Sequence, residues 1–281
     1  WREVARIRPA DALAYCNIAR LTLRTSLDAA IAMGFAERAL ELQPQLAEAH
    51  GCRAQLLQFQ GRCDEAIAEC DLALQIDPGA FHIRMIRALA LLTAGRFAEG
   101  WKDYEERKRV YAIYAKRQYP FAEWDGSLLQ GKCVLVTCEQ GLGDEIMFAS
   151  CLPDLLVTGA HCVIECSDRL QPLFARSFGA ARVIVADQTS SDLSYLGTLP
   201  AIDYVISAGS LPRIFRAAMQ DFPDNAAYLD ADAGLTEVWR TRLQGLPQGL
   251  RLGWRHQLDL EPQPEDRFVS ILTVFPFFQY Y

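Results

Sequence analysis

The sequence predicts an α + α/β protein, in which a helical repeat array is followed by an α/β domain built on a parallel sheet. Two observations support this fold class. The first part of the chain repeats itself with a period of 34 residues, and from residue 132 onward short apolar runs alternate with helix-like stretches. Such alternation is typical of a parallel sheet with helices on both faces. A chain of 281 residues is long enough for both parts.

The repeat is visible in two pairs of matching segments. Leu40-Glu-Leu-Gln-Pro44 recurs as Leu74-Gln-Ile-Asp-Pro78, and Gly61-Arg-Cys-Asp-Glu-Ala66 recurs as Gly95-Arg-Phe-Ala-Glu-Gly100, each 34 residues later (78 − 44 and 95 − 61). Amphipathic stretches that break at Gly or Pro predict helices over 49–59, 64–74, 83–94 and 98–109. Because one helix pair cannot bury its apolar face alone, we expect each pair to stack on its neighbour.

This helix–turn–helix unit resembles the tetratricopeptide repeat, so we expect a tetratricopeptide-like α-solenoid over about residues 10–112. The second unit carries the small and helix-ending residues of that repeat at Ala54, Ala66, Ala73 and Pro78. The other two units match less completely, with Arg20, Ala32, Ala39 and Pro44 in the first and Ala88, Gly100 and Ala112 in the third. Such arrays usually bind a protein or peptide in a concave groove. The alternative is a spacer that only docks on the next domain.

The α/β part is expected to contain strands at 132–137, 162–165, 182–186, 204–207 and 250–254, with helices at 144–157, 169–178, 211–219 and 235–243. Pro120 ends the last repeat helix, because the residue before a proline avoids the helical region, and Trp124-Asp-Gly126 indicates a turn. The expected domains are 1–118 for the repeats, 119–131 for a linker, 132–250 for the α/β domain and 251–281 for the truncated start of a second α/β domain.

The most informative segment follows the first expected strand. Glycines at 141 and 143 permit a sharp turn and a close approach to a ligand, and Asp144 stands where a helix begins. Ligands of open α/β sheets bind at the carboxyl ends of strands, so this turn is the candidate site. It is a poor dinucleotide fingerprint, because Ile146 replaces the third glycine and an acid at the helix start opposes a phosphate.

Charge and cysteine content exclude several classes of function. The net charge of −7 disfavours a nucleic-acid partner, and the basic runs Arg107–Arg109 and Lys116-Arg117 are interpreted as solvated helix faces. The nine cysteines form no Cys-x-x-Cys pair, and Cys162 and Cys166 lack a second ligand pair, so we expect free thiols in a reducing compartment and no metal. No apolar run reaches the length of about 18 residues that a membrane span needs. The protein is therefore expected to be cytoplasmic.

A wider resemblance connects these segments. The repeats, then Gly95–Glu105, Trp124–Gly126 and Cys138-Glu-Gln-Gly-Leu-Gly-Asp144, together resemble the bacterial tetratricopeptide-repeat glycosyltransferase-like proteins. Ser210-Leu-Pro212 and Gly253-Trp-Arg255 match as well. The catalytic part of that family is similar to the heptosyltransferases and has a glycosyltransferase B fold with two Rossmann-like halves. The resemblance implies that this chain holds the acceptor half and only the beginning of the half that binds the nucleotide-sugar.

The resemblance also implies roles for individual residues. Asp144 matches the general base, and the acceptor-binding loop would comprise Glu139, Gln140, Gly141, Leu142 and Gly143. Trp254 and Arg255 would lie on the donor side of the cleft. No metal and no cofactor beyond the nucleotide-sugar substrate is implied. The alternatives are structural: Asp144 as a helix-capping acid, Glu139 bonded to turn amides, Trp254 in a core and Arg255 on the surface.

The resulting expectation is a glycosyltransferase-like protein that transfers a sugar from a nucleotide-sugar to an unidentified acceptor and binds a protein through its repeats. The first residue is Trp1 and the last segment is an uncharged apolar tail, so we expect a fragment of a longer protein that is inactive by itself. A non-catalytic tetratricopeptide scaffold for protein interactions is the alternative function.

Overall fold

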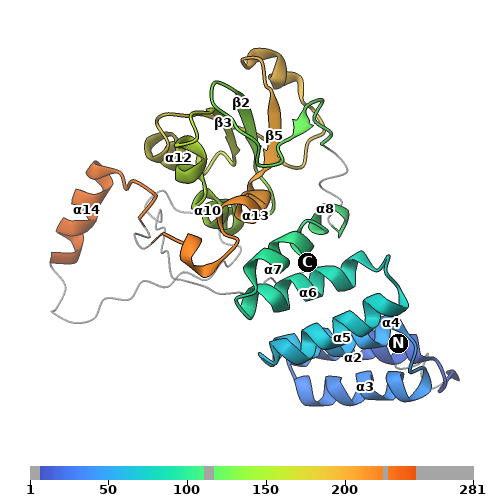
Figure 1. Ribbon diagram of the computed structural model, residues 1–281. Helices are drawn as coiled ribbons and strands as arrows, with labels where there is room; N and C mark the ends of the chain where they lie inside the picture. Colours follow the sequence, from blue (N-terminus) through green and yellow to red (C-terminus); the bar gives the residue numbers. More distant parts are fainter. Residues whose placement is uncertain (1–6, 111–116, 224–226, 245–281) are drawn as a thin grey trace. The chain divides into compact units, whose positions relative to one another are not determined.

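The computed structural model describes residues 7–110, 117–223 and 227–244 (Figure 1). The chain divides into two compact units, Trp1–Asp230 and Ala231–Tyr281. The described part of the first unit contains a run of helices followed by a parallel sheet, and that of the second contains helix α14 (Ala233–Gln244). The fold class is thus α + α/β, as predicted. The strand expected at 250–254 and the second domain expected at 251–281 lie outside the described residues.

Helices fill the first part of the chain, and consecutive helices from α2 to α7 pack against one another. In addition, α2 contacts α4 and α4 contacts α6, which is how stacked helix pairs meet. Three of the helices begin at 34-residue intervals, at Ala29, Cys63 and Phe97. The bounds are α2 (Ala12–Ser26), α3 (Ala29–Leu42), α4 (Ala47–Phe59), α5 (Cys63–Ile76), α6 (Phe81–Thr93), α7 (Phe97–Tyr104) and α8 (Arg107–Val110).

Small residues allow these helices to pack closely. Ala54, Ala66 and Ala73 are completely buried. At Gly100 a Cβ would lie 2.7 Å from Leu92 Cγ and 3.0 Å from the Leu92 backbone nitrogen, so α7 can approach α6 only with a glycine there. The residue that departs from the repeat pattern in the sequence therefore has a packing reason.

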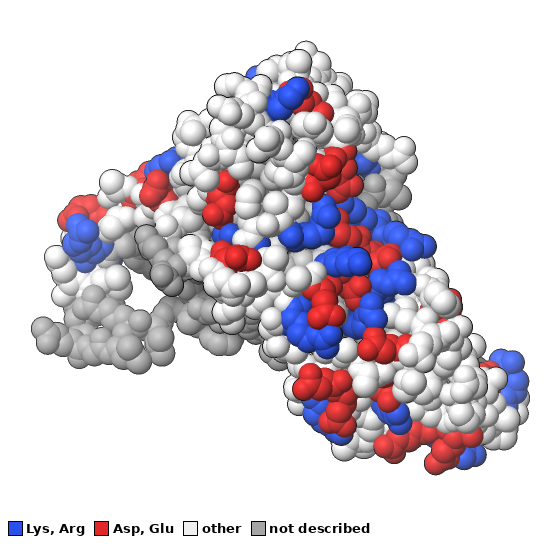
Figure 2. Space-filling view, in the orientation of Figure 1, with Lys and Arg blue, Asp and Glu red and all other residues white. Residues whose placement is uncertain are grey.

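Ion pairs cross between neighbouring helices. Arg87 of α6 contacts Asp71 of α5 at 2.5 Å and Asp103 of α7 at 2.7 Å. Arg20 of α2 contacts Glu48 of α4 at 2.6 Å. This arginine stands where the repeat usually has a small residue, and its charge is accommodated there by the ion pair. On the face shown in Figure 2, basic and acidic side chains lie intermingled over the helical part. Most of these charges therefore have a partner of opposite sign nearby.

The sheet is parallel throughout and has the order β1-β5-β2-β3-β4. Every residue of β2 is buried, which explains why its sequence is an apolar run. The direction of winding reverses between β2 and β5, because β3 follows on one side of β2 and β5 pairs on the other. The strands are β1 (Ala122–Glu123), β2 (Cys133–Thr137), β3 (His161–Cys166), β4 (Arg182–Val185) and β5 (Tyr204–Ser207).

The helices expected at 144–157, 169–178 and 211–219 are shorter or divided, whereas α14 covers the whole of the helix expected at 235–243. The helix predicted over 144–157 is two helices, because Pro153 cannot donate to the carbonyl of Ala149 four residues earlier and instead stands in the first turn of the second helix. The connecting elements are α10 (Leu142–Ala149), α11 (Leu152–Leu156), α12 (Gln171–Ser177), the 3₁₀ helices η1 (Ser194–Thr198), η2 (Ala208–Ser210) and η3 (Met219–Asp221), and α13 (Leu211–Phe215).

The stretch expected to be a linker is packed into the α/β part. Its residues 122–123 form the edge strand β1 beside β5, and the Trp124 N–H donates to the Val205 carbonyl at 2.9 Å. Trp124 and Leu129 are each only 2% exposed. A strand of two residues gives no periodic signal and is therefore not predictable from local patterns. In the parts of the chain that the structure describes, no helix is long and apolar enough to cross a membrane.

Candidate functional site

A cavity of about 350 Å³ lies at the carboxyl ends of β2 and β5. This is the point where the strand order reverses, the usual position of a ligand site in an open α/β sheet. Hydroxyl, carboxylate, amide and cationic side chains share the lining with apolar ones. The lining residues are Lys108, Arg117, Tyr119, Phe121, Glu123, Thr137, Cys138, Glu139, Gln188, Val205 and Ser207.

The loop between β2 and α10 turns at Gln140, which has a φ of 62°. Gly141 has a φ of −104° and caps α10, and Gly143 belongs to the first turn of that helix. Within this loop the left-handed conformation is thus adopted by Gln140 and not by Gly141. At Gly143 a Cβ would meet nothing within 4 Å, so packing does not require a glycine at this position.

Asp144 faces back toward the start of its own helix. Its Oδ2 accepts a hydrogen bond from the Gly141 N–H at 3.1 Å, which is the capping contact of the structural alternative. Burial raises the pKa of Asp144, and the negative charge of Glu139 raises it further. Among described residues, Asp144 is not part of the cavity lining, whereas Glu139 is. A general-base role for Asp144 stays a prediction.

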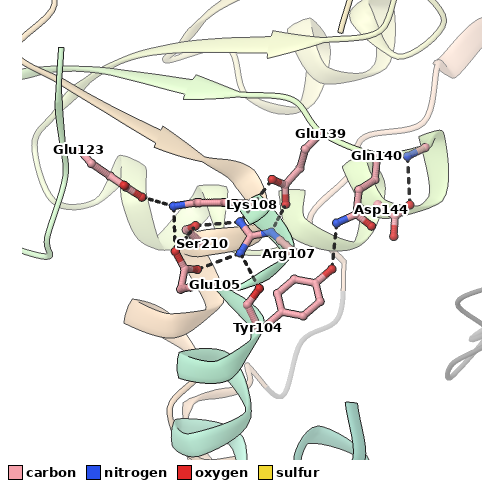
Figure 3. Close-up of polar contacts among 10 residues, drawn as sticks. Tyr104, Glu105, Arg107, Lys108, Glu123, Glu139, Gln140, Asp144 and Ser210 are labelled. Carbon is pink, nitrogen blue, oxygen red and sulfur yellow. Dashed lines mark hydrogen bonds and ion pairs between the residues drawn. The ribbon is translucent and has the colours of Figure 1, made fainter. Parts of the chain in front are cut away.

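Glu139 is held by an arginine from the helical part of the chain (Figure 3). Arg107 Nε donates to Glu139 Oε1 at 3.0 Å, and its Nη2 donates to Oε2 at 3.3 Å. The same Nη2 donates to Ser210 Oγ at 2.8 Å, and Nη1 donates to Glu105 Oε1 at 2.9 Å. Arg107 is 0% exposed. The interpretation of residue 107 as part of a solvated helix face is therefore wrong, although Arg109 does have an exposed side chain.

Tyr104 holds the next residue of the loop. Gln140 Nε2 donates to the Tyr104 hydroxyl oxygen at 2.9 Å. The Tyr104 ring also lies under the Arg107 guanidinium, 4.8 Å from its carbon, and 6.2 Å from the ring of Phe148 in α10. Burial raises the pKa of Tyr104, so the phenol remains protonated and neutral at physiological pH. The loop after β2 is thus contacted by both α7 and α8.

Gly209 lets η2 approach the buried carboxylate. A Cβ at this position would overlap Glu139 Oε1 and would lie 2.9 Å from Glu139 Cδ. Its neighbour Ser210 donates to Glu105 Oε2 at 3.0 Å while accepting from Arg107. The segment after β5 therefore closes over the pair formed by Arg107 and Glu139.

A second buried cluster surrounds Glu165 at the end of β3. Arg117 Nη2 lies 3.0 Å from Glu165 Oε2, and the hydroxyls of Tyr119 and Tyr195 also donate to this carboxylate. The Arg117 side chain is 6% exposed. The prediction of a solvated Arg117 is wrong as well, because a buried carboxylate from a distant part of the chain neutralises its charge. Lys116 lies outside the described residues.

Glu145 connects α10 to two other strand ends. Its Oε2 accepts from the Ser167 N–H and its Oε1 from Gln188 Nε2, both at 2.9 Å. Burial raises the pKa of this carboxyl group. Local sequence patterns do not single out Glu145, Tyr104 or Gly209, because the partners of these residues are far away in the chain.

Cys162 and Cys166 are buried free thiols, and burial raises their pKa values to about 11 and about 12. Within residues 7–110, 117–223 and 227–244, no group of three His, Cys, Asp or Glu side chains is arranged to hold a metal ion. Trp254 and Arg255 lie outside the described residues, so their donor-side role stays a prediction.

No protein-family model matches the chain. The chain is 32% identical over 240 residues to Protein FlbA from Caulobacter vibrioides, an alignment that covers 80% of this chain and 40% of that protein. The chain therefore spans less than half the length of this curated relative. Among solved structures, a mutant O-GlcNAc transferase from Thermobaculum terrenum gives a TM-score of 0.35 at 16% identity, covering 66% of this chain and 36% of that one. A likeness at this level assigns neither a fold nor an activity.

Proposed function

We propose that this chain is the repeat array and acceptor half of a metal-independent glycosyltransferase-like protein. The observation that carries the proposal is the cavity at the carboxyl ends of β2 and β5, beside the loop that the sequence resemblance marks as the acceptor loop. On this proposal the stacked helix pairs are tetratricopeptide-like. The sheet is a Rossmann-like half with its site at the reversal of strand order.

The lining of the cavity suits a neutral acceptor rich in hydroxyl groups. Thr137, Ser207 and Gln188 offer groups that both donate and accept hydrogen bonds, and Tyr119 adds an aromatic ring. Of the two cations in the lining, Lys108 pairs with Glu123, which lines the same cavity, and Arg117 pairs with Glu165. The lining also contains Glu139, which pairs with Arg107. A diphosphate would need an excess of positive charge, so we assign the donor to the other half of the fold. The volume of about 350 Å³ lies within the usual range for small-molecule sites.

Asp144 does not line the cavity itself, but it belongs to the loop that contributes Glu139 to the lining, and it would act as the general base toward an acceptor hydroxyl that reaches this loop. Burial and Glu139 raise its pKa, which moves a carboxyl group toward the range where it removes protons effectively near neutral pH. The capping bond from Gly141 would hold Oδ2 in a fixed direction. Oδ1 would then be the oxygen that receives the proton. Catalysis of this kind needs no metal.

Asp144→Asn in the full-length natural protein tests this role. Asparagine keeps a side-chain oxygen for the Gly141 N–H and removes a charge that burial disfavours, so the melting temperature should not fall. Loss of a general base should lower turnover by about 10²–10⁴-fold. The assay is release of nucleoside diphosphate from a panel of nucleotide-sugars with candidate acceptors, followed by mass spectrometry of the product.

Asp168→Asn is the matched control, because Asp168 is exposed and follows β3 at the same edge of the sheet. It should leave turnover unchanged. Activity of Asp144→Asn within a few-fold of wild type, at an unchanged melting temperature, would rule out Asp144 as the base. Absence of transfer by the wild-type protein would favour the second candidate.

The second candidate function is a non-catalytic scaffold that binds a protein or peptide in the groove of the repeats. The specific observation in its favour is the Gly141–Asp144 capping bond, which gives Asp144 a complete structural role. If the protein is a scaffold, the wild type and the Asp144→Asn variant should bind the partner equally well, and neither should release nucleoside diphosphate.

A further inference from the structure

We propose that the helical array is a part of the candidate site, and that Arg107 is the positioning residue that sets the conformation of the loop 138–144. The identity of the site rests on the proposed function. The test below measures the loop directly, so it can fail or succeed independently of any transferase activity.

Arg107 spans the two strand ends between which the sheet reverses its order. Its guanidinium contacts Glu139 directly after β2 and Ser210 in η2 directly after β5 (Figure 3). β2 and β5 are neighbouring strands in the sheet. A guanidinium is a rigid planar fork, so two parallel bonds to one carboxylate fix the plane of that carboxylate as well as its position. A contact from α8 therefore orients an acidic group that lines the cavity.

A second contact from the helical array holds Gln140, the next residue of the loop. Gln140 has a positive φ, a conformation that a non-glycine residue keeps only when its surroundings hold it. The Tyr104 hydroxyl of α7 accepts from its side chain at 2.9 Å. The next residue, Gly141, donates its N–H to Asp144. Contacts thus run without interruption from α7 and α8 through Glu139 and Gln140 to Asp144.

The same helical turn also contributes a side chain to the lining of the cavity. Lys108 follows Arg107, lines the cavity and pairs with Glu105 at 2.8 Å and with Glu123 of β1. A molecule bound in this cavity would contact the helical array as well as the sheet. The array is consequently more than a neighbouring module: without α7 and α8 the cavity would lose one wall, and its loop would lose the contacts to Tyr104 and Arg107.

Hydrogen exchange of the full chain, followed by mass spectrometry, tests the proposal. The variants are Arg107→Met, which removes the fork, and Tyr104→Phe, which removes only the hydroxyl and preserves the ring. Arg109→Met is the matched control, since Arg109 is exposed and pairs with Glu106 at 3.2 Å. Peptides that cover 138–149 report on the loop, and peptides from α5 report on global unfolding.

We expect exchange of the loop peptides to accelerate by about fivefold in Tyr104→Phe, the effect of one hydrogen bond. In Arg107→Met the acceleration should reach about a hundredfold or more, because a buried carboxylate loses the guanidinium fork of Arg107. The α5 peptides should change less than the loop peptides in both variants, and Arg109→Met should match wild type throughout.

Two results would overturn the proposal. One is an unchanged rate for the loop peptides in both variants. The other is an equal acceleration of loop and α5 peptides, which would mean that Arg107 and Tyr104 serve only global stability. If Arg107→Met fails to fold, Tyr104→Phe alone decides whether the helical array controls the conformation of the loop. This substitution removes one hydroxyl group and leaves the packing of the ring intact.

Discussion

Gly209→Ala measures how tightly the two strand ends close around the pair formed by Arg107 and Glu139. The added Cβ would overlap Glu139 Oε1 and would lie 2.9 Å from Glu139 Cδ and 3.1 Å from Arg107 Nε. Arg107 is 0% and Glu139 2% exposed, so the carboxylate cannot swing into solvent while staying paired. Breaking a buried ion pair by removing one partner costs about 3–5 kcal/mol. Here both charges stay and part of their attraction survives, so we expect a loss of about 2–4 kcal/mol.

Urea unfolding followed by circular dichroism gives this value as a shift of the midpoint at constant slope. Gly143→Ala is the control, because a Cβ at 143 meets nothing within 4 Å and the residue lies in a helix. Alanine there should stabilise the protein by up to about 1 kcal/mol. A loss below about 1 kcal/mol for Gly209→Ala would refute the reasoning, since it would mean that the buried pair moves aside at little cost.

Two further predictions concern the helical part. The hydrogen bond to His82 lowers the pKa of Glu48 to about 2 against the opposing effect of burial. The stabilisation that the ionised Glu48 gives the folded protein is therefore present above the ordinary pKa of 4.5 and is lost as the pH falls toward 2. Glu48→Gln should remove this part of the decrease in unfolding free energy at acid pH, and an unaltered decrease would contradict the assignment. Gly100→Ala should cost about 1–3 kcal/mol through overlap with Leu92, whereas Gly34→Ala, in an open stretch of α3, should gain up to about 1 kcal/mol by the same urea assay.

Local signals in the sequence predict most of the elements. Glycines and prolines mark helix ends, and the small residues at 54, 66 and 73 mark close helix contacts, so α4, α5 and α6 lie within a few residues of their expected bounds. The helix expected over 98–109 is instead divided into α7 and α8. The strand at 133–137 was predictable because a strand buried on both faces is a continuous apolar run. β1 was not, because its two residues are ordered by β5, which lies about 80 residues later in the chain.

The candidate site has features that local sequence patterns do not predict. The turn after β2 could be located from its glycines, but the residue in the left-handed conformation is Gln140, which Tyr104 and the surrounding packing hold in place. Arg107 was misinterpreted because a run of basic residues was judged by type alone. A better signal existed: Phe97, Gly100, Tyr104 and Arg107 follow each other at helical spacing, and all four are at least partly buried. An arginine in register with an apolar face indicates a buried partner.

The choice of an ion pair at this junction is itself informative. Apolar side chains at 107 and 139 could bury similar surface, and replacing a buried ion pair by well-packed apolar residues is often neutral or stabilising. Apolar contact is non-directional, however, whereas the arginine fork fixes both the distance and the plane of the carboxylate. Arg107 further bonds Ser210 and Glu105, so one side chain defines how α8, the loop after β2 and the segment after β5 meet. What the pair contributes is therefore orientation at the edge of a cavity, which is where a binding site needs it.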